Sequence, residues 1–352
     1  MKKNICIVAG ARPNFVKVAP LMRAIAKADG AECRLIYAGR ADDPTLEPSL
    51  FDDLQMQRPD EYLGVDSTSL NEITSRVMAE FDAYLDSHPT DVVIVVDDLA
   101  STMAAAIVTK KRGVKLAHLV AGTRSFDITM PKEINRLVID ALSDYLFTAG
   151  VKSNSVATRE QGEDSQTYMV GNILMDNLRF NRERLRRPAI GLPDSPYLVL
   201  TLNRKALLAD TGRLQPVLQA LMASGTPIVA PLRGQARQVV SQLVGQAPQL
   251  HLVDPLPYLE FGWLTAHALG IVTDSGNVAE EATFNGVPCI TLNSYTEHQE
   301  TVTTGTNELV GGDPQKLADA LARLLRGEWK HGALPERWDG RSAERIVQIL
   351  LA

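Results

Sequence analysis

The sequence has little cysteine, no long apolar run and no strong excess of either charge. Three cysteines occur in 352 residues, Cys6, Cys33 and Cys289, each in apolar surroundings and far from the others. An odd number without metal-like spacing argues against a disulfide framework and a zinc site, and favours buried, reduced thiols in a cytoplasmic protein. No stretch approaches the roughly 20 apolar residues that a transmembrane helix requires. We interpret the short apolar run after Lys3 as a first strand rather than a signal peptide.

The formal net charge of -6 gives no reason to expect a nucleic acid as partner. An anionic ligand must therefore be held by a local cluster of basic residues. Hydrophobic and charged contents of 45% and 22% are ordinary for a globular protein. A chain of 352 residues exceeds the size at which one core keeps growing, so we expect two domains.

The segment 115–148 reads as a buried strand over 115–120, a polar loop from Gly122 and a helix from about Pro131. A charged loop between a parallel strand and a helix N-terminus is where α/β sheets bind ligands, anions especially. The alternative is an ordinary strand, loop and helix with a solvated loop. The spacing on the helix predicts one buried apolar stripe, made of Ile134, Leu137, Val138, Ala141 and Leu142.

Two glycine turns follow predicted strands. The first, Gly10–Asn14, lies between an apolar run at 4–9 and a helix over about 15–27. Arg12 and Lys17 stand where they could meet a phosphate, or they are plain surface charges. The second turn, Asp274–Asn277, lies between a strand at 271–273 and another helix. Backbone N–H groups at such a helix start can hold a phosphate.

Two adjacent carboxylates, Asp97 and Asp98, follow the buried strand Val92–Val96. Paired acids at the carboxyl end of a strand suggest a chemical role, although one of them could simply cap the next helix.

These motifs closely resemble those of the non-hydrolysing UDP-N-acetylglucosamine 2-epimerases. Similar blocks cover nearly the whole chain, including the two turns, a loop at 255–261, and a last helix at 339–346. In the central segment the residues that match the family signature are His118, Ala121, Gly122, Arg124, Ser125, Met130, Pro131, Glu133, Asn135, Arg136, Asp140, Leu142, Ser143 and Asp144.

The resemblance implies two Rossmann-like α/β domains facing a cleft, in a GT-B-like arrangement. The predicted domains are residues 1–172 and 173–335, with a helix in 336–352 crossing back to the first. In the family UDP lies mostly on the second domain and the sugar faces the first. The family needs no metal or redox cofactor and has no membrane partner, and its members are often dimers, so a homodimer is expected.

The resemblance also assigns roles to residues. The predicted catalytic residues are Asp98 and Glu133, with Asp97 or Lys132 as further proton-handling groups. Phe261 would lie near the uracil ring, unless it is a hydrophobic staple for the next helix. The predicted contacts to substrate and nucleotide are Arg12, Lys17, Arg124, Arg136, Arg204, Phe261, Ser275, Gly276, Glu281 and Glu297.

Several positions depart from the family pattern. Val120 and Lys132 stand where the family has glutamates, and Asn203 where it has a histidine. Arg40 and Ala41 replace residues of a regulatory sugar-nucleotide site, so we do not expect that regulation.

Three functions follow from these departures. The first is C2 inversion of a sugar nucleotide by UDP elimination and re-addition, with an altered acid–base pair or substrate. The second is a hydrolase or glycosyltransferase that leaves the C2 proton in place. The third is a sugar-nucleotide binder without catalysis.

Overall fold

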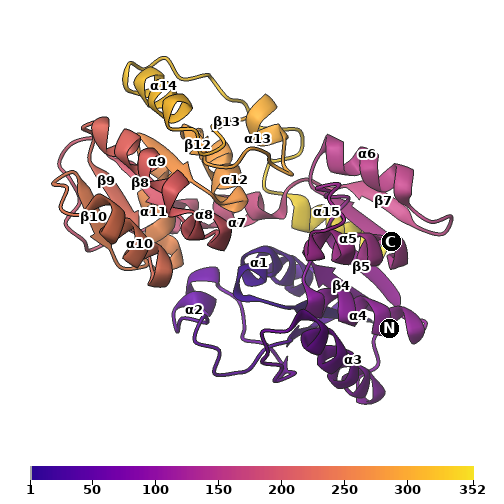
Figure 1. The fold of residues 1–352 in the computed structure, drawn as a ribbon. Helices are drawn as coiled ribbons and strands as arrows, with labels where there is room; N and C mark the ends of the chain where they lie inside the picture. The colour runs from indigo at the N-terminus through magenta and orange to yellow at the C-terminus, as the bar shows by residue number, and fades with distance from the viewer. Residues whose placement is uncertain (1) are drawn as a thin grey trace. The chain divides into compact units, whose positions relative to one another are not determined.

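The computed structural model describes residues 2–352 and divides the chain into two compact units. Unit 1 extends to Asn181 and includes Glu336–Ala352, and unit 2 is Arg182–Pro335 (Figure 1). The first boundary lies beyond the predicted residue 172, because the helix α7 (Ile173–Asn181) packs on two helices of unit 1. The segment from residue 336 belongs to unit 1, where its helix contacts the first helix of the chain.

Unit 1 is a parallel sheet in the order β3-β2-β1-β4-β5-β6-β7, with helices between the strands. The valine-rich strand predicted at Val92–Val96 is present with those bounds, and every residue in it is buried. The strands are β1 (Lys3–Ala9), β2 (Ala31–Tyr37), β3 (Glu61–Tyr62), β4 (Val92–Val96), β5 (Lys115–Ala121), β6 (Tyr145–Thr148) and β7 (Gln166–Met169). The helices are α1 (Arg12–Lys27), α2 (Leu50–Leu54), α3 (Leu70–Ser87), α4 (Ala100–Lys111), α5 (Pro131–Leu142), α6 (Val151–Glu160), α7 and α15 (Ser342–Leu351).

Helices cover the unit 1 sheet in two groups. α4 lies between α3 and α5, whereas α1, α7 and α15 pack on one another. Under α3 and α4 the core is built from aromatic and aliphatic side chains such as Phe81, Val93 and Ala105. A parallel sheet with helices on its faces requires strands that are apolar on both sides, which explains the apolar runs in the sequence.

Unit 2 repeats this architecture with the sheet order β10-β9-β8-β11-β12-β13. In its central strand, Leu198 and Leu200 face the core under α9 and α14, while Val199 faces the opposite core. The strands are β8 (Leu198–Thr201), β9 (Ile228–Pro231), β10 (Leu250–Val253), β11 (Gly270–Thr273), β12 (Cys289–Thr291) and β13 (Asn307–Leu309). The helices are η1 (Arg182–Arg184), α8 (Lys205–Ala209), α9 (Thr211–Ala223), α10 (Gly234–Val244), α11 (Tyr258–Ala266), α12 (Gly276–Asn285), α13 (Glu300–Thr303) and α14 (Pro314–Leu325). Both units are therefore Rossmann-like, as predicted.

Each sheet has one point where the strand order reverses direction. In unit 1 this point lies between β1 and β4, and in unit 2 between β8 and β11. Open parallel sheets bind ligands in the crevice outside the carboxyl ends of the two strands at such a point. The loops that follow these four strands are 10–11, 97–99, 202–204 and 274–275, and together with the helix starts after them they define the two crevices considered below.

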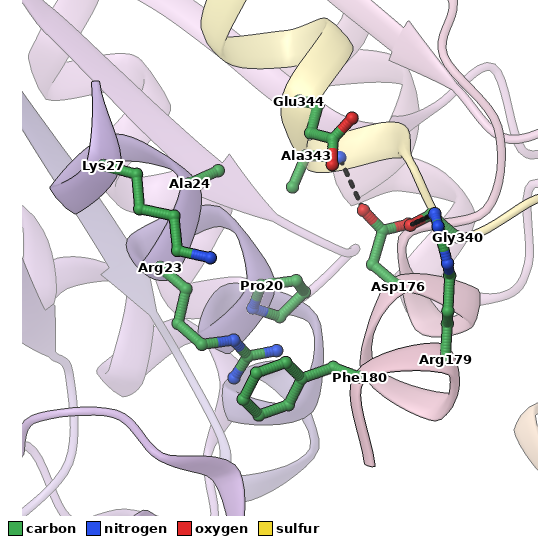
Figure 2. A pocket seen from close by; sticks show the side chains of 10 residues that line it. All are labelled: Pro20, Arg23, Ala24, Lys27, Asp176, Arg179, Phe180, Gly340, Ala343 and Glu344. Carbon is green, nitrogen blue, oxygen red and sulfur yellow. Dashed lines mark hydrogen bonds between the residues drawn. The ribbon is translucent and has the colours of Figure 1, made fainter. Parts of the chain in front are cut away.

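Asp176 joins the two segments of unit 1 that are distant in sequence. Its carboxylate on α7 accepts hydrogen bonds from the N–H groups of Ser342 and Ala343 at the start of α15, at 3.0 and 2.7 Å. Figure 2 shows the bond between Asp176 and Ala343, which lies at the edge of a cavity of about 270 Å³ between α1, α7 and α15. On its other side the guanidinium of Arg23 lies 3.9 Å from the centre of the Phe180 ring. Burial raises the pKa of Asp176 to about 6.

We expect a pH-dependent contribution of Asp176 to the stability of unit 1. A carboxyl whose pKa is raised by folding stabilises the fold below its unfolded pKa of about 3.9 and loses this contribution as the pH rises through the folded value. Wild type should therefore lose about 2 kcal/mol between pH 4 and pH 7 relative to Asp176→Asn. Denaturant unfolding of both proteins across this range measures the difference, and parallel stability curves would contradict the prediction.

Within residues 2–352, no helix is both long and apolar enough to cross a membrane. Cys6, Cys33 and Cys289 are all unpaired. Cys6 and Cys289 are buried as predicted, while Cys33 is partly exposed.

Candidate functional site

The unit 1 crevice is formed by the loop after β1 and the loop after β4, and these loops touch. A side chain at Gly10 would collide with the hydroxyl of Ser101 at the start of α4, 2.1 Å from the position of a Cβ atom. A larger residue at position 10 would therefore force neighbouring side chains, such as that of Ser101, to move.

The first turn of α1 is held by polar side chains. Asn14 accepts hydrogen bonds from the N–H groups of Gly10 and Ala11, at 2.8 and 3.2 Å. Arg12 forms a bidentate pair with Glu47, which lies in the segment before α2. Asp97 accepts hydrogen bonds from Asn14 Nδ2 at 2.7 Å and from Lys17 Nζ at 2.5 Å. The predicted phosphate ligands Arg12 and Lys17 therefore both face carboxylates.

Asp98 points to a different set of partners. Arg136 Nη2 lies 2.6 Å from Oδ2 of Asp98, and Lys132 Nζ lies 3.3 Å from Oδ1. Burial alone would raise the pKa of Asp98, but Lys132 and Arg136 together hold it below its usual value. Neither Asp97 nor Asp98 caps α4, because the N-cap residue is Leu99, whose N–H donates to Oγ1 of Thr102 at 3.0 Å. Asp98 is thus an ionised, partly exposed base at neutral pH.

Glu133 organises the loop before α5. Its carboxylate accepts hydrogen bonds from the N–H groups of Ser125 and Phe126, at 2.9 and 3.0 Å, and lies 3.1 Å from Arg136 Nη1. Burial favours the neutral acid, yet these donors hold the pKa of Glu133 below its usual value. Its side chain is 3% exposed, so Glu133 acts on the loop and on Arg136 more directly than on a ligand.

The predicted buried stripe of α5 is wrong. Ile134 and Leu137 are 46% and 38% exposed, whereas Glu133, Asn135 and Arg136 are buried. Periodicity locates the apolar face of a helix but does not say which face turns inward. Here the polar face turns inward because its side chains bond to one another and to the β4 loop, as Asn135 Nδ2 does to the carbonyl of Asp98 at 2.8 Å.

A buried network lies beneath the crevice. His118 Nδ1 lies 2.5 Å from Asp140, and its Nε2 lies 3.1 Å from the carbonyl oxygen of Asp97. Arg124 pairs with Asp140 at 2.7 Å and with Glu160 at 2.9 Å. Burial opposes ionisation of Asp140, but His118 and Arg124 hold its pKa below the usual value. The side chain of Arg124 is 2% exposed, so its predicted role as a ligand contact remains a prediction.

Val120 occupies an irregular position in β5. The pairing of β5 with β6 shifts register between Leu119 and Ala121, and Val120 has a φ of 75°. A β-branched residue is strained in this left-handed region. Bulges of this kind often redirect a side chain beside an active site, and the side chain here is one that cannot carry a proton.

We expect Val120→Asn to stabilise unit 1 by about 1 kcal/mol, because asparagine tolerates the left-handed conformation. Val151→Asn, at an exposed position with ordinary helical backbone, is the control and should change stability by less than about 0.5 kcal/mol. Denaturant unfolding measures both. Equal effects of the two substitutions would show that the backbone at residue 120 stores no strain.

The unit 2 crevice is built around Asp274. This residue is completely buried, and its carboxylate accepts hydrogen bonds from the N–H groups of Asn203 and Arg204, both in the loop after β8. The carbonyl of Asp274 accepts from Arg204 Nε at 2.9 Å and from Asn293 Nδ2 at 3.1 Å. Asp274 thereby fixes the two loops of the crevice and the predicted ligand contact Arg204.

Ser275 and Gly276 open α12 at the same crevice. Ser275 is the N-cap residue without a side-chain bond to the helix, and the first turn holds no acidic residue. A helix start of this kind favours an anion. Further along α12, Glu280 pairs with His298 at 3.0 Å. Burial, aided by the charge of Glu280, raises the pKa of Glu281 to about 7.

The remaining predicted residues lie apart from these contacts. Phe261 is partly buried within α11, and Glu297 is partly buried in the segment after β12. Arg40 pairs with Asp42 and Asp66 on the surface of unit 1. Ala41 is exposed beside it.

In unit 1 the structure brings together the predicted Arg12, Lys17, Asp97, Asp98 and Arg136, while in unit 2 Arg204, Ser275 and Gly276 meet. Sequence reasoning did not propose Asn14, Glu47 or Asp274 as site residues. Asn14 and Asp274 do stand in the two glycine turns, which is a signal that could have found them. Glu47 lies in a segment without any motif.

Comparison with known proteins gives the chain's relatives. The sequence model of a family described as UDP-N-acetylglucosamine 2-epimerase matches residues 23–351. The UDP-N-acetylglucosamine 2-epimerase of Methanocaldococcus jannaschii is 31% identical over 365 residues, covering 99% of this chain and 98% of the relative. The UDP-2,3-diacetamido-2,3-dideoxy-D-glucuronate 2-epimerase of Pseudomonas aeruginosa is 31% identical over 353 residues and 99% of both chains.

Solved structures agree with these relatives. The M. jannaschii UDP-GlcNAc 2-epimerase in complex with UDP-GlcNAc and UDP has a TM-score of 0.84 and 30% identity, with 99% of both chains covered. The enzyme from Neisseria meningitidis bound to UDP-GlcNAc has a TM-score of 0.90 and 24% identity, again over 99% of both chains, and shows the shared fold. The two units therefore have the GT-B-like fold of these proteins.

Proposed function

Since the chain belongs to the UDP-N-acetylglucosamine 2-epimerase family, a family of isomerases, we propose that it inverts C2 of a UDP-linked N-acetylhexosamine. Inversion proceeds by elimination and re-addition. A base removes the C2 proton while UDP leaves C1 with the electron pair of the C1–O bond, which gives a glycal. UDP then adds back to C1, and a proton is delivered to the opposite face of C2.

We place the diphosphate on unit 2. The observation that supports this is the start of α12, which has no side-chain cap and no acidic residue in its first turn. Arg204, fixed by Asp274, adds a cation at the same crevice. Such a site stabilises the charge that develops on departing UDP.

We assign the base to Asp98 and the acid to Lys132. The observation that carries this proposal is the cluster of Asp98, Lys132 and Arg136 at the carboxyl end of β4. The lowered pKa of Asp98 keeps its carboxylate ionised at neutral pH, and the side chain of Lys132 beside it is 59% exposed and so reachable by a ligand. Asp97 is bound to Lys17 and Asn14, so we leave it out of proton transfer.

One observation favours the alternative in which the C2 proton stays in place. Inversion requires proton-handling groups on opposite faces of the sugar, whereas Asp98 and Lys132 lie 3.3 Å apart. Val120 and Asn203 cannot titrate and therefore supply no second group. Cleavage of the C1–O bond with transfer to water or another acceptor would need only the diphosphate site.

Incubation with UDP-N-acetylglucosamine and separation of the products tests these functions. The proposal predicts the manno epimer as the main product. Free UDP with an unchanged sugar configuration would support the hydrolase or transferase. Tight binding of UDP without any product would support a binder without catalysis.

The two relatives named above act, by name, on sugar nucleotides of different charge. One carries an uncharged sugar and the other a glucuronate, yet both relatives are 31% identical to this chain. Sequence identity alone therefore does not decide the sugar.

We also propose that the chain forms a homodimer through α5. Ile134, Leu137 and Ala141 form an exposed apolar stripe on this helix, with Val138 partly exposed beside them. A second copy offers the same stripe, as a two-fold interface requires.

We retain the cytoplasmic location as a prediction that cell fractionation can test.

We expect Leu137→Asp to convert the dimer to a monomer, because it places a charge in the centre of the stripe. Leu334→Asp is the matched control at an exposed leucine of unit 2 and should leave the dimer intact. Sedimentation velocity measures both. A monomeric wild type, or a dimeric Leu137→Asp, would contradict the proposed interface.

A further inference from the structure

The unit 1 crevice presents no net positive charge to a ligand. Four cationic side chains lie at it, and each is within ion-pair distance of a carboxylate. The pairs are Arg12 with Glu47, Lys17 with Asp97, Lys132 with Asp98, and Arg136 with Asp98 and Glu133. Four cations are thus balanced by four anions within the described residues. In unit 2, by contrast, the first turn of α12 holds no acidic residue, and the carboxylate of Asp274 before it is buried and bound to backbone N–H groups.

Asp97 places a fixed negative charge at this crevice. It has a φ of 60°, a left-handed conformation that aspartate tolerates but most residues do not. Its carbonyl accepts a hydrogen bond from His118 if Nε2 carries the proton, at 3.1 Å, which ties this loop to the buried network. Its carboxylate is held by Asn14 and Lys17 at the first turns of α1. The negative charge of Asp97 is therefore fixed beside the helix start that would otherwise attract an anion.

The two N–H groups just before that helix are also engaged. Asn14 Oδ1 accepts the N–H groups of Gly10 and Ala11, and Asn14 Nδ2 donates to Asp97. An anionic group entering the crevice would meet a side-chain amide in place of two backbone donors. It would also approach the carboxylates of Asp97 and Asp98, whose side chains are 18% and 13% exposed.

We propose that Asp97 is a specificity-determining residue that selects a sugar nucleotide whose sugar carries no carboxylate. This inference rests on the proposed function, in which Asp98 of unit 1 takes the C2 proton of the sugar. An uncharged N-acetylhexosamine can hydrogen-bond to the paired side chains and leave their charges balanced. A hexuronate would add a further negative charge to a crevice whose cations are already paired, and like charges at short range are unfavourable.

Dissociation constants measured by calorimetry for UDP, UDP-N-acetylglucosamine and UDP-N-acetylglucosaminuronate test this inference. Wild type should bind the uronate at least about tenfold more weakly than the uncharged sugar nucleotide. The reason is that the added carboxylate comes close to a carboxylate of the crevice, and the repulsion of two like charges at short range costs at least this much binding free energy. Asp97→Asn keeps the shape and the tolerance for the left-handed conformation, so it should narrow this ratio to about two- to threefold. Asp97→Gly, which suits the same conformation without any side chain, should narrow it as well.

Asp82→Asn serves as the matched control. It also removes a carboxylate that pairs with an arginine, Arg112, but on the surface of α3. This variant should keep the wild-type ratio. If wild type binds both sugar nucleotides equally, or if Asp97→Asn and Asp97→Gly keep the wild-type ratio, the selectivity assigned to Asp97 is wrong.

The measurement with UDP separates this inference from the function on which it rests. Binding of UDP with equal constants for the two sugar nucleotides would overturn the selectivity alone. Failure of wild type to bind UDP would overturn the proposed function and this inference with it.

Discussion

Replacing Asp98 with asparagine is expected to reduce turnover of the sugar nucleotide by about 10²- to 10⁴-fold, the usual contribution of a positioned general base. The amide retains the size of the carboxylate and can still accept a hydrogen bond from Arg136, so the crevice should keep its shape. It cannot accept a proton. Because the diphosphate is placed on unit 2, the affinity for UDP should change by less than about threefold.

The control for Asp98 is Asp66→Asn, which removes an exposed carboxylate that pairs with Arg40. Its turnover should equal that of wild type. Steady-state rates and UDP affinity are measured for both proteins. Full activity of Asp98→Asn would exclude this residue as the base, whereas a large loss of UDP affinity would place the diphosphate on unit 1 instead.

Replacing Asp140 with alanine should destabilise unit 1 by about 3–5 kcal/mol, because it leaves His118 and Arg124 buried without their shared carboxylate. The N–H group of Gly122 loses its acceptor as well. Gly122 lies in a tight turn, where a Cβ atom would approach the carbonyl of Ser153 to 2.1 Å. We therefore expect the loop before α5 to loosen and catalysis to fall together with stability.

Trp338 offers a specific measurement of this loss. It is the tryptophan of unit 1, is 1% exposed, and donates from Nε1 to the carbonyl of Ala149 at 3.0 Å. In a background in which Trp263 and Trp329 of unit 2 are phenylalanine, its fluorescence reports the unfolding of unit 1 alone. Asp127→Ala, an exposed aspartate in the same loop, is the control and should cost less than about 1 kcal/mol.

The pH dependence of Asp140 has the opposite sign to that of Asp176. Folding lowers the pKa of Asp140, so its contribution to stability is present above the unfolded value of about 3.9 and is lost as the pH falls below it. Wild type should approach the stability of Asp140→Ala in acid. A difference between them that persists unchanged at pH 2 would show that the carboxylate charge is not what stabilises the network.

Much of the fold was predictable because the local sequence patterns favour the same strands and helices that the topology of the two sheets requires. The run Val92–Val96 can only be a strand buried on both faces, and the glycine turn before α12 marks a strand-to-helix connection. Unit 1 extends to Asn181, beyond the predicted residue 172, because α7 packs on α1 and α15. Such packing depends on residues more than 150 positions away, which no local pattern records.

The sequence indicated which residues stand at the ends of the strands, but it did not indicate which side chains form ion pairs with one another. Strand ends and glycine turns place Arg12, Lys17, Asp98 and Ser275 at the two crevices, and the roles assigned to these residues stay predictions. The pairing of Arg12 with Glu47 was missed, because ion pairs between distant segments leave no periodic signal. The prediction of which face of α5 turns inward was wrong for a related reason. The polar side chains of α5 bond to the loop after β4, and no local pattern records such contacts.

Exchange of the C2 proton in deuterated buffer tests the central claim most directly. Proton NMR of UDP-N-acetylglucosamine incubated with the protein follows the C2 proton, the anomeric proton and free UDP together. We predict that the C2 proton signal is lost as the manno epimer appears, and that Asp98→Asn prevents both changes. Release of UDP with the C2 proton retained would contradict the claim, because the C1–O bond would then break without deprotonation.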